Sequence, residues 1–239
     1  MDNNVNKLSN EKWSSEIDQI FLDQASPYEL KCYHNRYHLA WERAVAPAMV
    51  LEKLKLRSLP FLVVDAATGS GAGAAYLYEQ LSWIDSTAQV IGIDLDPDAI
   101  AYATEHYAHS RLRFVRGDIV QVLKGLRPHV VVSMETLEHI SQEAMRDFLQ
   151  TVSEQLNPGG KAIFSSPRLR PRESTVKRPG HINEMYFQQF RYTLGEYFPM
   201  VEFYGFDRYG NIGPEDPSCN LQVGIASKWH QTTVFRKPS

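Results

Sequence analysis

Cysteine and long apolar runs are scarce in this sequence. Only Cys32 and Cys219 occur among 239 residues, so a disulfide framework is excluded. No apolar stretch approaches the ~18 residues that a membrane-spanning helix needs. The polar start of the chain lacks the basic end and apolar core of an export signal. We therefore expect a cytoplasmic protein that does not associate with membranes.

An excess of positive charge is also missing. The chain has 25 Lys and Arg residues against 28 Asp and Glu residues, which gives a formal net charge of −3. This balance excludes the basic coat of many nucleic-acid-binding proteins, although it allows a local basic patch. The content of 43% hydrophobic and 22% charged residues is typical of a globular domain.

The chain divides into two regions by its patterning. Residues 1–58 carry helical spacing at Trp13, Ile17, Ile20 and Phe21, and again over 28–56, where Pro47 is expected to end or kink the helix. The prediction is an N-terminal helical extension or lid over 1–58, followed by one domain over 59–239.

Short strand-like runs alternate with helical ones in the second region. The predicted strands are 61–65, 88–94, 112–115, 130–134, 161–165, 201–205 and 221–225, and the predicted helices are 72–83, 98–106, 119–126, 142–156 and 183–197. Residues 210–214 have the composition of a loop. The alternation predicts an α/β fold, with a parallel sheet that has helices on both faces.

A glycine-rich turn follows the first predicted strand, in the segment VVDAATGSGAG (63–73). The strand ends at Asp65, and Gly69 and Gly71 allow positive φ and a close approach of the backbone to a ligand. The N-terminus of the next helix offers unpaired N–H groups. The spacing also fits a dinucleotide-binding loop, and a tight turn without a ligand is a further alternative.

Carboxylates also follow the next two predicted strands. Asp94 lies 21 residues after Gly73, where an acid can accept the hydroxyls of a ribose. Asp118 could accept the amino group of a purine, or it could be a plain turn residue. Asp96, directly before Pro97, is better explained as a helix N-cap.

Asp65 separates the two nucleotide interpretations. A pyrophosphate at the glycine loop would face the carboxylate of Asp65, whereas a ligand with an ammonium group would be attracted to it. Together the acids indicate a ligand made of adenine, ribose and an amino acid, which is S-adenosylmethionine.

Residues 61–167 resemble the class I S-adenosylmethionine-dependent methyltransferases. The resemblance rests on five segments in order: VVDAATGSGAG, VIGIDLDPDAI, LRFVRGDI, VVVSMETLEH and LNPGGKAIFSSP. It implies a Rossmann-like sheet of seven strands whose last strand is antiparallel. It also implies a cofactor site made of Asp65, Ala67, Gly69, Gly71, Asp94, Leu95, Asp118, Ile119 and Glu135. Ala67 stands where the family usually has a glycine, which limits positive φ in this turn.

The segment after the fourth predicted strand, Glu135-Thr-Leu-Glu138-His139, suggests a metal site. If Glu135 begins a helical turn, Glu138 and His139 lie beside it on one face. With His181 as a fourth ligand, they would form a shell for Mg²⁺ or another divalent ion. Alternatively, Glu138 and His139 only orient their loop, and His181 packs or caps a helix. Without a metal, His139 or His181 could act as the catalytic base.

The E-x-x-E-H segment, with the later His181-x-x-Glu184, most resembles sugar and polysaccharide O-methyltransferases. Metal-dependent methyltransferases of RNA 3′ ends and quinone precursors look alike at the same points. Arg168 stands where these groups often have Asn. Arg168, Arg170, Arg172, Lys177 and Arg178 form either a solvated loop or a recognition site for an anionic acceptor. The pair Arg36-Tyr37 resembles a feature that precedes the core in relatives, where it either packs or closes over the cofactor.

The resulting prediction is O-methylation of a small-molecule or saccharide-like hydroxyl by S-adenosylmethionine. The alternatives are 2′-O-methylation of RNA 3′ ends, a nicotinamide-dependent oxidoreductase and a non-catalytic cofactor-binding pseudoenzyme. Nucleic acid is not the expected partner, since the chain has no overall basic charge. The sequence leaves open the acceptor, O- versus N-methylation and the oligomeric state.

Overall fold

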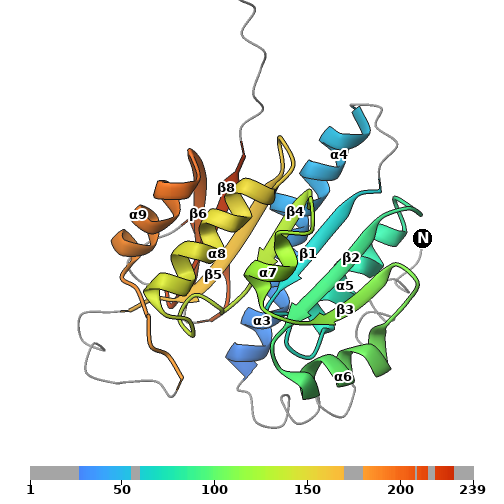
Figure 1. Cartoon of the computed structure of the whole chain (residues 1–239). Helices are drawn as coiled ribbons and strands as arrows, with labels where there is room; N and C mark the ends of the chain where they lie inside the picture. Colours follow the sequence, from blue (N-terminus) through green and yellow to red (C-terminus); the bar gives the residue numbers. More distant parts are fainter. Residues whose placement is uncertain (1–26, 55–59, 170–179, 208, 215–218, 229–239) are drawn as a thin grey trace, which may run out of the picture.

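A mixed β-sheet forms the centre of the molecule (Figure 1). The computed structural model describes residues 27–54, 60–169, 180–207, 209–214 and 219–228. The predicted helical stripe at Trp13–Phe21 and the basic residues Arg170, Arg172, Lys177 and Arg178 lie outside these ranges. The strands are β1 (Leu62–Ala66), β2 (Gln89–Asp94), β3 (Leu112–Arg116), β4 (Val130–Ser133), β5 (Lys161–Pro167), β6 (Met200–Phe206), β7 (Ile212–Pro214) and β8 (Leu221–Ser227).

The strand order is β3-β2-β1-β4-β5-β8-β6-β7. Strands β1 to β5 pair in parallel, so their carboxyl ends lie at one edge of the sheet. Strand β8 is antiparallel to both β5 and β6. The predicted antiparallel last strand is thereby confirmed, together with the Rossmann-like α/β architecture.

The number of strands differs from the prediction, because the described sheet has eight strands and not seven. The extra strand, β7, comes from the segment 210–214 that was predicted as a loop. It has three residues, pairs only with β6 at the sheet edge, and contains Gly213 and Pro214. Both residue types weaken a strand pattern, and proline is tolerated at such an edge, so no strand pattern is visible in the sequence of this segment.

Helices cover both faces of the sheet (Figure 1). One face carries α3 (Pro27–Ala40), the π-helical turn η1 (Trp41–Val45), α4 (Ala46–Leu54), α5 (Ala72–Ser82) and α6 (Pro97–Tyr107). The other face carries α7 (Ile119–Leu123), α8 (Gln142–Gln155) and α9 (Phe187–Tyr197). Successive strand residues face opposite cores: Val63 belongs to the first and Val64 to the second, and both are fully buried. The sheet is thus buried on both sides, as its continuous apolar runs predict.

Pro47 does not end the helical region that contains it. The chain instead widens into the π-helical turn η1, where the N–H of Ala46 donates to the carbonyl of Trp41, and Pro47 then lies in the first turn of α4. Proline is tolerated in a first turn because its missing N–H is not needed there. The π-helical turn therefore accommodates Pro47, which was expected to end or kink the helix.

Helix α9 begins at Phe187, four residues later than its predicted start at Asn183. The N–H of Asn183 donates to the carbonyl of Glu138, and the carbonyl of Met185 accepts from the N–H of Leu169. These tertiary bonds hold residues 183–186 in a non-helical path that leads to the site described below.

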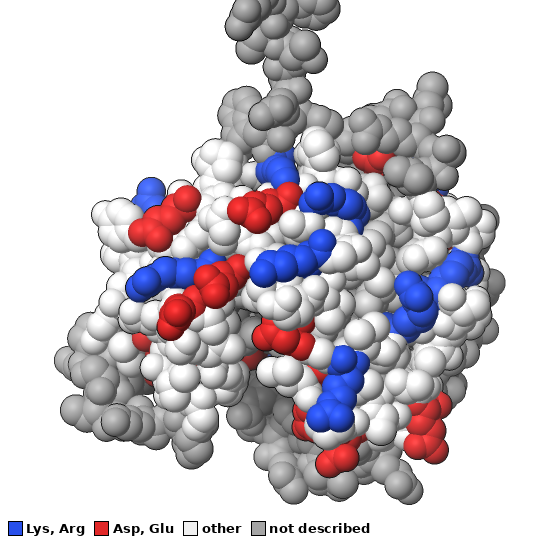
Figure 2. All heavy atoms as spheres, in the orientation of Figure 1, with Lys and Arg blue, Asp and Glu red and all other residues white. Residues whose placement is uncertain are grey.

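Charges of both signs alternate on the face that Figure 2 shows, without a field of one sign. This agrees with the near-neutral composition of the whole chain. Among the described residues, no helix is long and apolar enough to cross a membrane.

Candidate functional site

The glycine loop connects β1 to α5 at the carboxyl edge of the sheet. Asp65 lies at the end of β1 and is fully buried. Its carboxylate accepts hydrogen bonds from the Thr68 hydroxyl at 2.7 Å and from the Tyr37 hydroxyl at 3.2 Å. Burial raises the pKa of Asp65 to about 7, although both hydrogen bonds act in the opposite direction. A buried carboxyl group without a cationic partner would gain a favourable interaction on binding a cationic ligand.

The turn itself uses positive φ at three positions. Gly69 has φ 55° and Gly71 has φ 84°, and a Cβ on Gly71 would lie 2.6 Å from the Cβ of Ala103. Ala67 has φ 61°, so alanine does not keep this position out of the left-handed region, contrary to the sequence-based expectation. The conformation costs an alanine about 1–2 kcal/mol, which the surrounding structure must offset.

Asp94 ends β2, and Asp118 follows the end of the neighbouring strand β3 by two residues. The Asp94 carboxylate accepts from the N–H of Gly69 at 2.8 Å and from the N–H of Asp96 at 3.0 Å, so it braces the glycine loop. Asp118 is exposed and caps α7, accepting from the N–H of Gln121 at 3.0 Å. Asp96 caps α6, as its position before Pro97 predicts. Asp94 and Asp118 thus each accept hydrogen bonds from neighbouring main-chain N–H groups, and both lie at the carboxyl edge of the sheet.

Helix α3 reaches both halves of the site through consecutive residues. The Tyr37 hydroxyl bonds Asp65 at the end of β1, and the Arg36 guanidinium lies 3.5 Å from Oε2 of Glu135, just after β4. The Tyr37 ring packs on the start of α5, where a Cβ on Gly73 would overlap it at 1.9 Å. The pair Arg36-Tyr37 therefore ties the helical extension to the edge where a ligand would bind.

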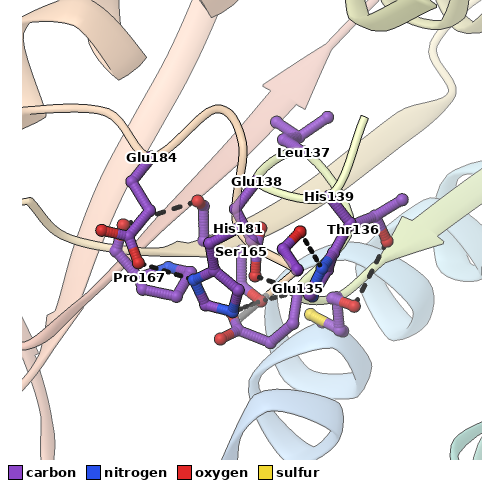
Figure 3. A network of polar contacts seen from close by, with 12 residues as sticks. Glu135, Thr136, Leu137, Glu138, His139, Ser165, Pro167, His181 and Glu184 are labelled. Atoms are coloured by element: carbon purple, nitrogen blue, oxygen red, sulfur yellow. Dashed lines mark hydrogen bonds and ion pairs between the residues drawn. The ribbon is translucent and has the colours of Figure 1, made fainter. Parts of the chain in front are cut away.

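A second group of polar side chains follows β4 and β5 (Figure 3). Glu138, His139 and His181 each offer a ligand atom, and these atoms lie within 4.8 Å of one another. The loop of His181 is held in place because the N–H groups of Ile182 and Asn183 both donate to the carbonyl of Glu138, at 2.8 and 3.0 Å. Three of the four predicted metal ligands therefore come together, although His181 follows His139 by 42 residues in the sequence.

Glu135 does not join this group. The turn comprises residues 137–139 and does not begin at Glu135, which lies in a bend before it with φ 52°. Its carboxylate accepts from the Ser165 hydroxyl at 2.8 Å and pairs with Arg36. The predicted alignment of Glu135 with Glu138 and His139 on one helical face was wrong, because positive φ at Glu135 directs its side chain elsewhere.

Glu138 is buried in an unusual way for a carboxylate. It is 0% exposed, and neither of its oxygens makes a hydrogen bond of ordinary geometry. Burial and the nearby charge of Glu135 raise the pKa of Glu138 to about 8. Its nearest ion-pair contact is Nε2 of His139 at 4.0 Å. A buried, unsatisfied carboxylate is costly, and such groups either hold a proton or meet a cation when a ligand binds.

The imidazole of His139 has a defined proton position. Its Nδ1 lies 3.1 Å from the carbonyl oxygen of Gly180, which can only accept a hydrogen bond. We therefore assign the proton to Nδ1, so the neutral ring carries its lone pair on Nε2, the atom nearer Glu138. His181 packs edge-on against this ring, with 4.7 Å between ring centroids.

Two further residues contribute contacts to the site, and the sequence alone predicted no role for them. Ser165 is buried on β5 and bonds Glu135, and Glu184 lies 2.6 Å from Nδ1 of His181. The spacing His181-x-x-Glu184 was a visible signal for the second contact. Arg168 stacks over the Phe187 ring at 5.4 Å, while most of the basic loop that follows lies outside the described residues.

Residues 63–160 match a family model described as a methyltransferase domain. The chain contains a methyltransferase domain. The match favours the methyltransferase prediction over the oxidoreductase alternative. No curated protein matches the sequence.

Solved structures agree with this methyltransferase at the level of the fold. They include the N-methyltransferase NodS of Bradyrhizobium japonicum in complex with S-adenosylhomocysteine (TM-score 0.62, 16% identity, 93% of this chain and 97% of that chain). A second is an S-adenosylmethionine-dependent methyltransferase of Archaeoglobus fulgidus (TM-score 0.54, 16% identity, 77% and 93%). A third is a candidate O-methyltransferase of Nostoc punctiforme (TM-score 0.55, 17% identity, 77% and 56%), so the chain spans little more than half of that protein. The fold is the Rossmann-like class I fold of S-adenosylmethionine-dependent methyltransferases.

Proposed function

We propose that this methyltransferase moves the methyl group of S-adenosylmethionine to a hydroxyl of a small, saccharide-like acceptor. The observation that carries the proposal is the close approach of Glu138, His139 and His181 at the carboxyl edge of the sheet. Glu138 and His139 follow β4, which is the neighbour of β1, the strand that leads into the glycine loop. Ligands of open α/β sheets bind at this edge.

The cofactor half of the proposal rests on the first two strands. The ammonium group of S-adenosylmethionine would pair with Asp65, and its ribose would bind Asp94 in exchange for the present bond to Gly69. Leu95 is a large apolar side chain that is 64% exposed directly after Asp94, and it would pack on the adenosine together with Ile119. Asp118 would accept the adenine amino group. Ala67, Gly69 and Gly71 would line the methionine part, with α3 as a lid.

The transfer is a displacement at the methyl carbon. The acceptor oxygen forms a bond to this carbon, the carbon–sulfur bond breaks, and its electron pair stays on sulfur. Alignment of oxygen, carbon and sulfur supplies much of the rate. The hydroxyl proton must leave, and Nε2 of His139 or His181 would receive it.

A divalent ion fits the same residues. Neither carboxylate oxygen of Glu138 makes a hydrogen bond of ordinary geometry, and the ligand atoms of two imidazoles lie within 4.8 Å of this carboxylate. Such an ion would lower the pKa of the acceptor hydroxyl and orient it. Two imidazoles with one carboxylate favour a transition metal over Mg²⁺. Glu135 would then act through its bonds to Arg36 and Ser165 and not as a ligand.

Methyl transfer to a panel of sugars and small hydroxyl compounds tests the proposal. We expect transfer from S-adenosylmethionine, and a loss of at least tenfold in kcat for Glu138→Gln and for His181→Ala. Treatment with EDTA separates the two ways of removing the proton: full activity of metal-free enzyme leaves only the histidine base. If short RNA 3′ ends were methylated and no small acceptor were, the acceptor class proposed here would be wrong.

A further inference from the structure

The ring of His181 needs more than its backbone to be oriented. Its loop is fixed by the bonds of Ile182 and Asn183 to the carbonyl of Glu138. These main-chain bonds place the Cα of His181, but they leave open the rotation of the ring and the nitrogen that carries the proton.

The Glu184 side chain supplies this missing restraint. Its Oε1 lies 2.6 Å from Nδ1 of His181, and the two side chains are only 11% and 16% exposed. A carboxylate accepts hydrogen bonds and does not donate them, so Nδ1 of His181 is the donor. In the neutral ring the lone pair then lies on Nε2.

Both histidines of the site are therefore set in the same way by different partners. His139 donates from Nδ1 to the main-chain carbonyl of Gly180, and His181 donates from Nδ1 to a side chain. Both rings approach the carboxylate of Glu138, and Figure 3 shows Glu184 on the side of His181 that is opposite to His139. A substitution can remove the partner of His181 but not that of His139.

We propose that Glu184 is a positioning residue that fixes the Nδ1–H form of His181 and aims its Nε2 at the acceptor site. The inference rests on the proposed function for the chemical role of Nε2 of His181, which is either the catalytic base or a metal ligand. The hydrogen-bonding role itself does not depend on which acceptor is methylated. Partners of this kind orient the imidazoles of many catalytic sites, and their loss lowers activity by about 10–100-fold.

Side-chain ¹⁵N NMR of the metal-free protein at alkaline pH tests the proposal directly, because it reports which nitrogen of each neutral histidine carries the proton. We expect the Nδ1–H form at His139 and His181. His129 provides a reference of the opposite form, because its Nδ1 accepts from the N–H of Leu62 at 3.0 Å.

Three variants complete the design. Glu184→Ala should move the His181 signals toward the Nε2–H form and leave those of His139 and His129 unchanged. Glu184→Gln should largely restore the wild-type signals, since its amide oxygen can still accept from Nδ1. Glu196→Ala removes an exposed carboxylate of α9 and should resemble the wild type. Unfolding temperatures of all three would show that the fold is retained.

Methyl transfer provides the second measurement. For Glu184→Ala we expect kcat to fall by about 10–100-fold with little change in the KM for S-adenosylmethionine, and Glu184→Gln to recover most of it. The proposal is overturned if wild-type His181 is in the Nε2–H form or doubly protonated, if its signals do not change in Glu184→Ala, or if they change while kcat stays the same. Absence of methyl transfer in the wild type would instead count against the proposed function, and the NMR result would still decide the role of Glu184.

Discussion

Asp65, in the proposed cofactor site, is held in an energetically unfavourable state that binding of a cationic ligand would relieve. Asp65 is fully buried, its pKa is raised to about 7, and its present partners are two hydroxyl groups. Because its folded pKa lies above the unfolded value near 4, the folded state binds more protons between these values. The stability of the ligand-free protein should therefore fall as the pH rises from about 4 to 7.

The same group predicts a pH dependence of cofactor binding. An ammonium group pairs with the ionised form of Asp65, so S-adenosylhomocysteine should bind roughly tenfold more tightly at pH 8 than at pH 6. Calorimetric titration at both values measures this. Asp65→Asn should flatten the dependence, whereas Asp85→Asn, in the turn before β2, should keep it. An unchanged dependence in Asp65→Asn would assign it to another group.

Ala67 predicts a gain in stability on substitution. Its φ of 61° is strained for alanine and natural for glycine, so Ala67→Gly should raise the free energy of unfolding by up to about 1 kcal/mol. Gly69→Ala is the reverse substitution at another position of positive φ. A Cβ there meets no atom within 4 Å, so only the effect of the backbone conformation is measured. It should destabilise by about 1–2 kcal/mol. Denaturant unfolding of both variants without ligand checks the pair, and a loss of stability in Ala67→Gly would contradict it.

At the scale of elements, the contact of α3 with α5 joins the helical extension to the carboxyl edge of the sheet. A Cβ on Gly73 would overlap the Tyr37 ring, whose hydroxyl bonds Asp65. Gly73→Ala should therefore displace α3, with a loss of about 1–3 kcal/mol in stability and weaker binding of S-adenosylhomocysteine.

The control for this substitution is Gly195→Ala in α9, where a Cβ would meet nothing within 4 Å. Helix propensity alone predicts a gain of about 0.5–1 kcal/mol there. Thermal unfolding with and without ligand measures both variants. If Gly73→Ala were as stable as Gly195→Ala and bound ligand normally, α3 would not be coupled to the site.

Elements also show what the sequence could predict. The central strands and α5, α6 and α8 were placed within about two residues, since each is a continuous apolar run or a helical stripe bounded by turn residues. Strand β7 and the start of α9 were not, because a three-residue edge strand and a stretch held by tertiary bonds leave no periodic signal.

The sequence also predicted one part of the candidate site and not the other. The order of strand ends predicted that Glu138, His139 and His181 would meet. The divergence of Glu135 depends on its positive φ and on Arg36 from α3, which no local pattern encodes.

For the whole molecule, cofactor binding should appear as stabilisation of the entire fold. At 100 times its dissociation constant, S-adenosylhomocysteine should stabilise the protein by ~2.7 kcal/mol. For a domain of this size, the unfolding temperature should rise by roughly 5–10 °C. NAD at the same concentration should have no effect. A shift with NAD alone would contradict the assignment of the ligand that rests on Asp65.

The place of β8 in the sheet has a consequence for how the protein is made. Strand β8 lies between β5 and β6 in the sheet but follows both in the sequence, so both of its neighbours are synthesised before it. Until residues 221–227 emerge, β5 and β6 each present an unpaired edge, which is a template for pairing with another nascent chain. Synthesis that stops before Leu221 should therefore yield an aggregating chain and not a smaller folded domain. Strand β8 is what joins β5 and β6 into one sheet.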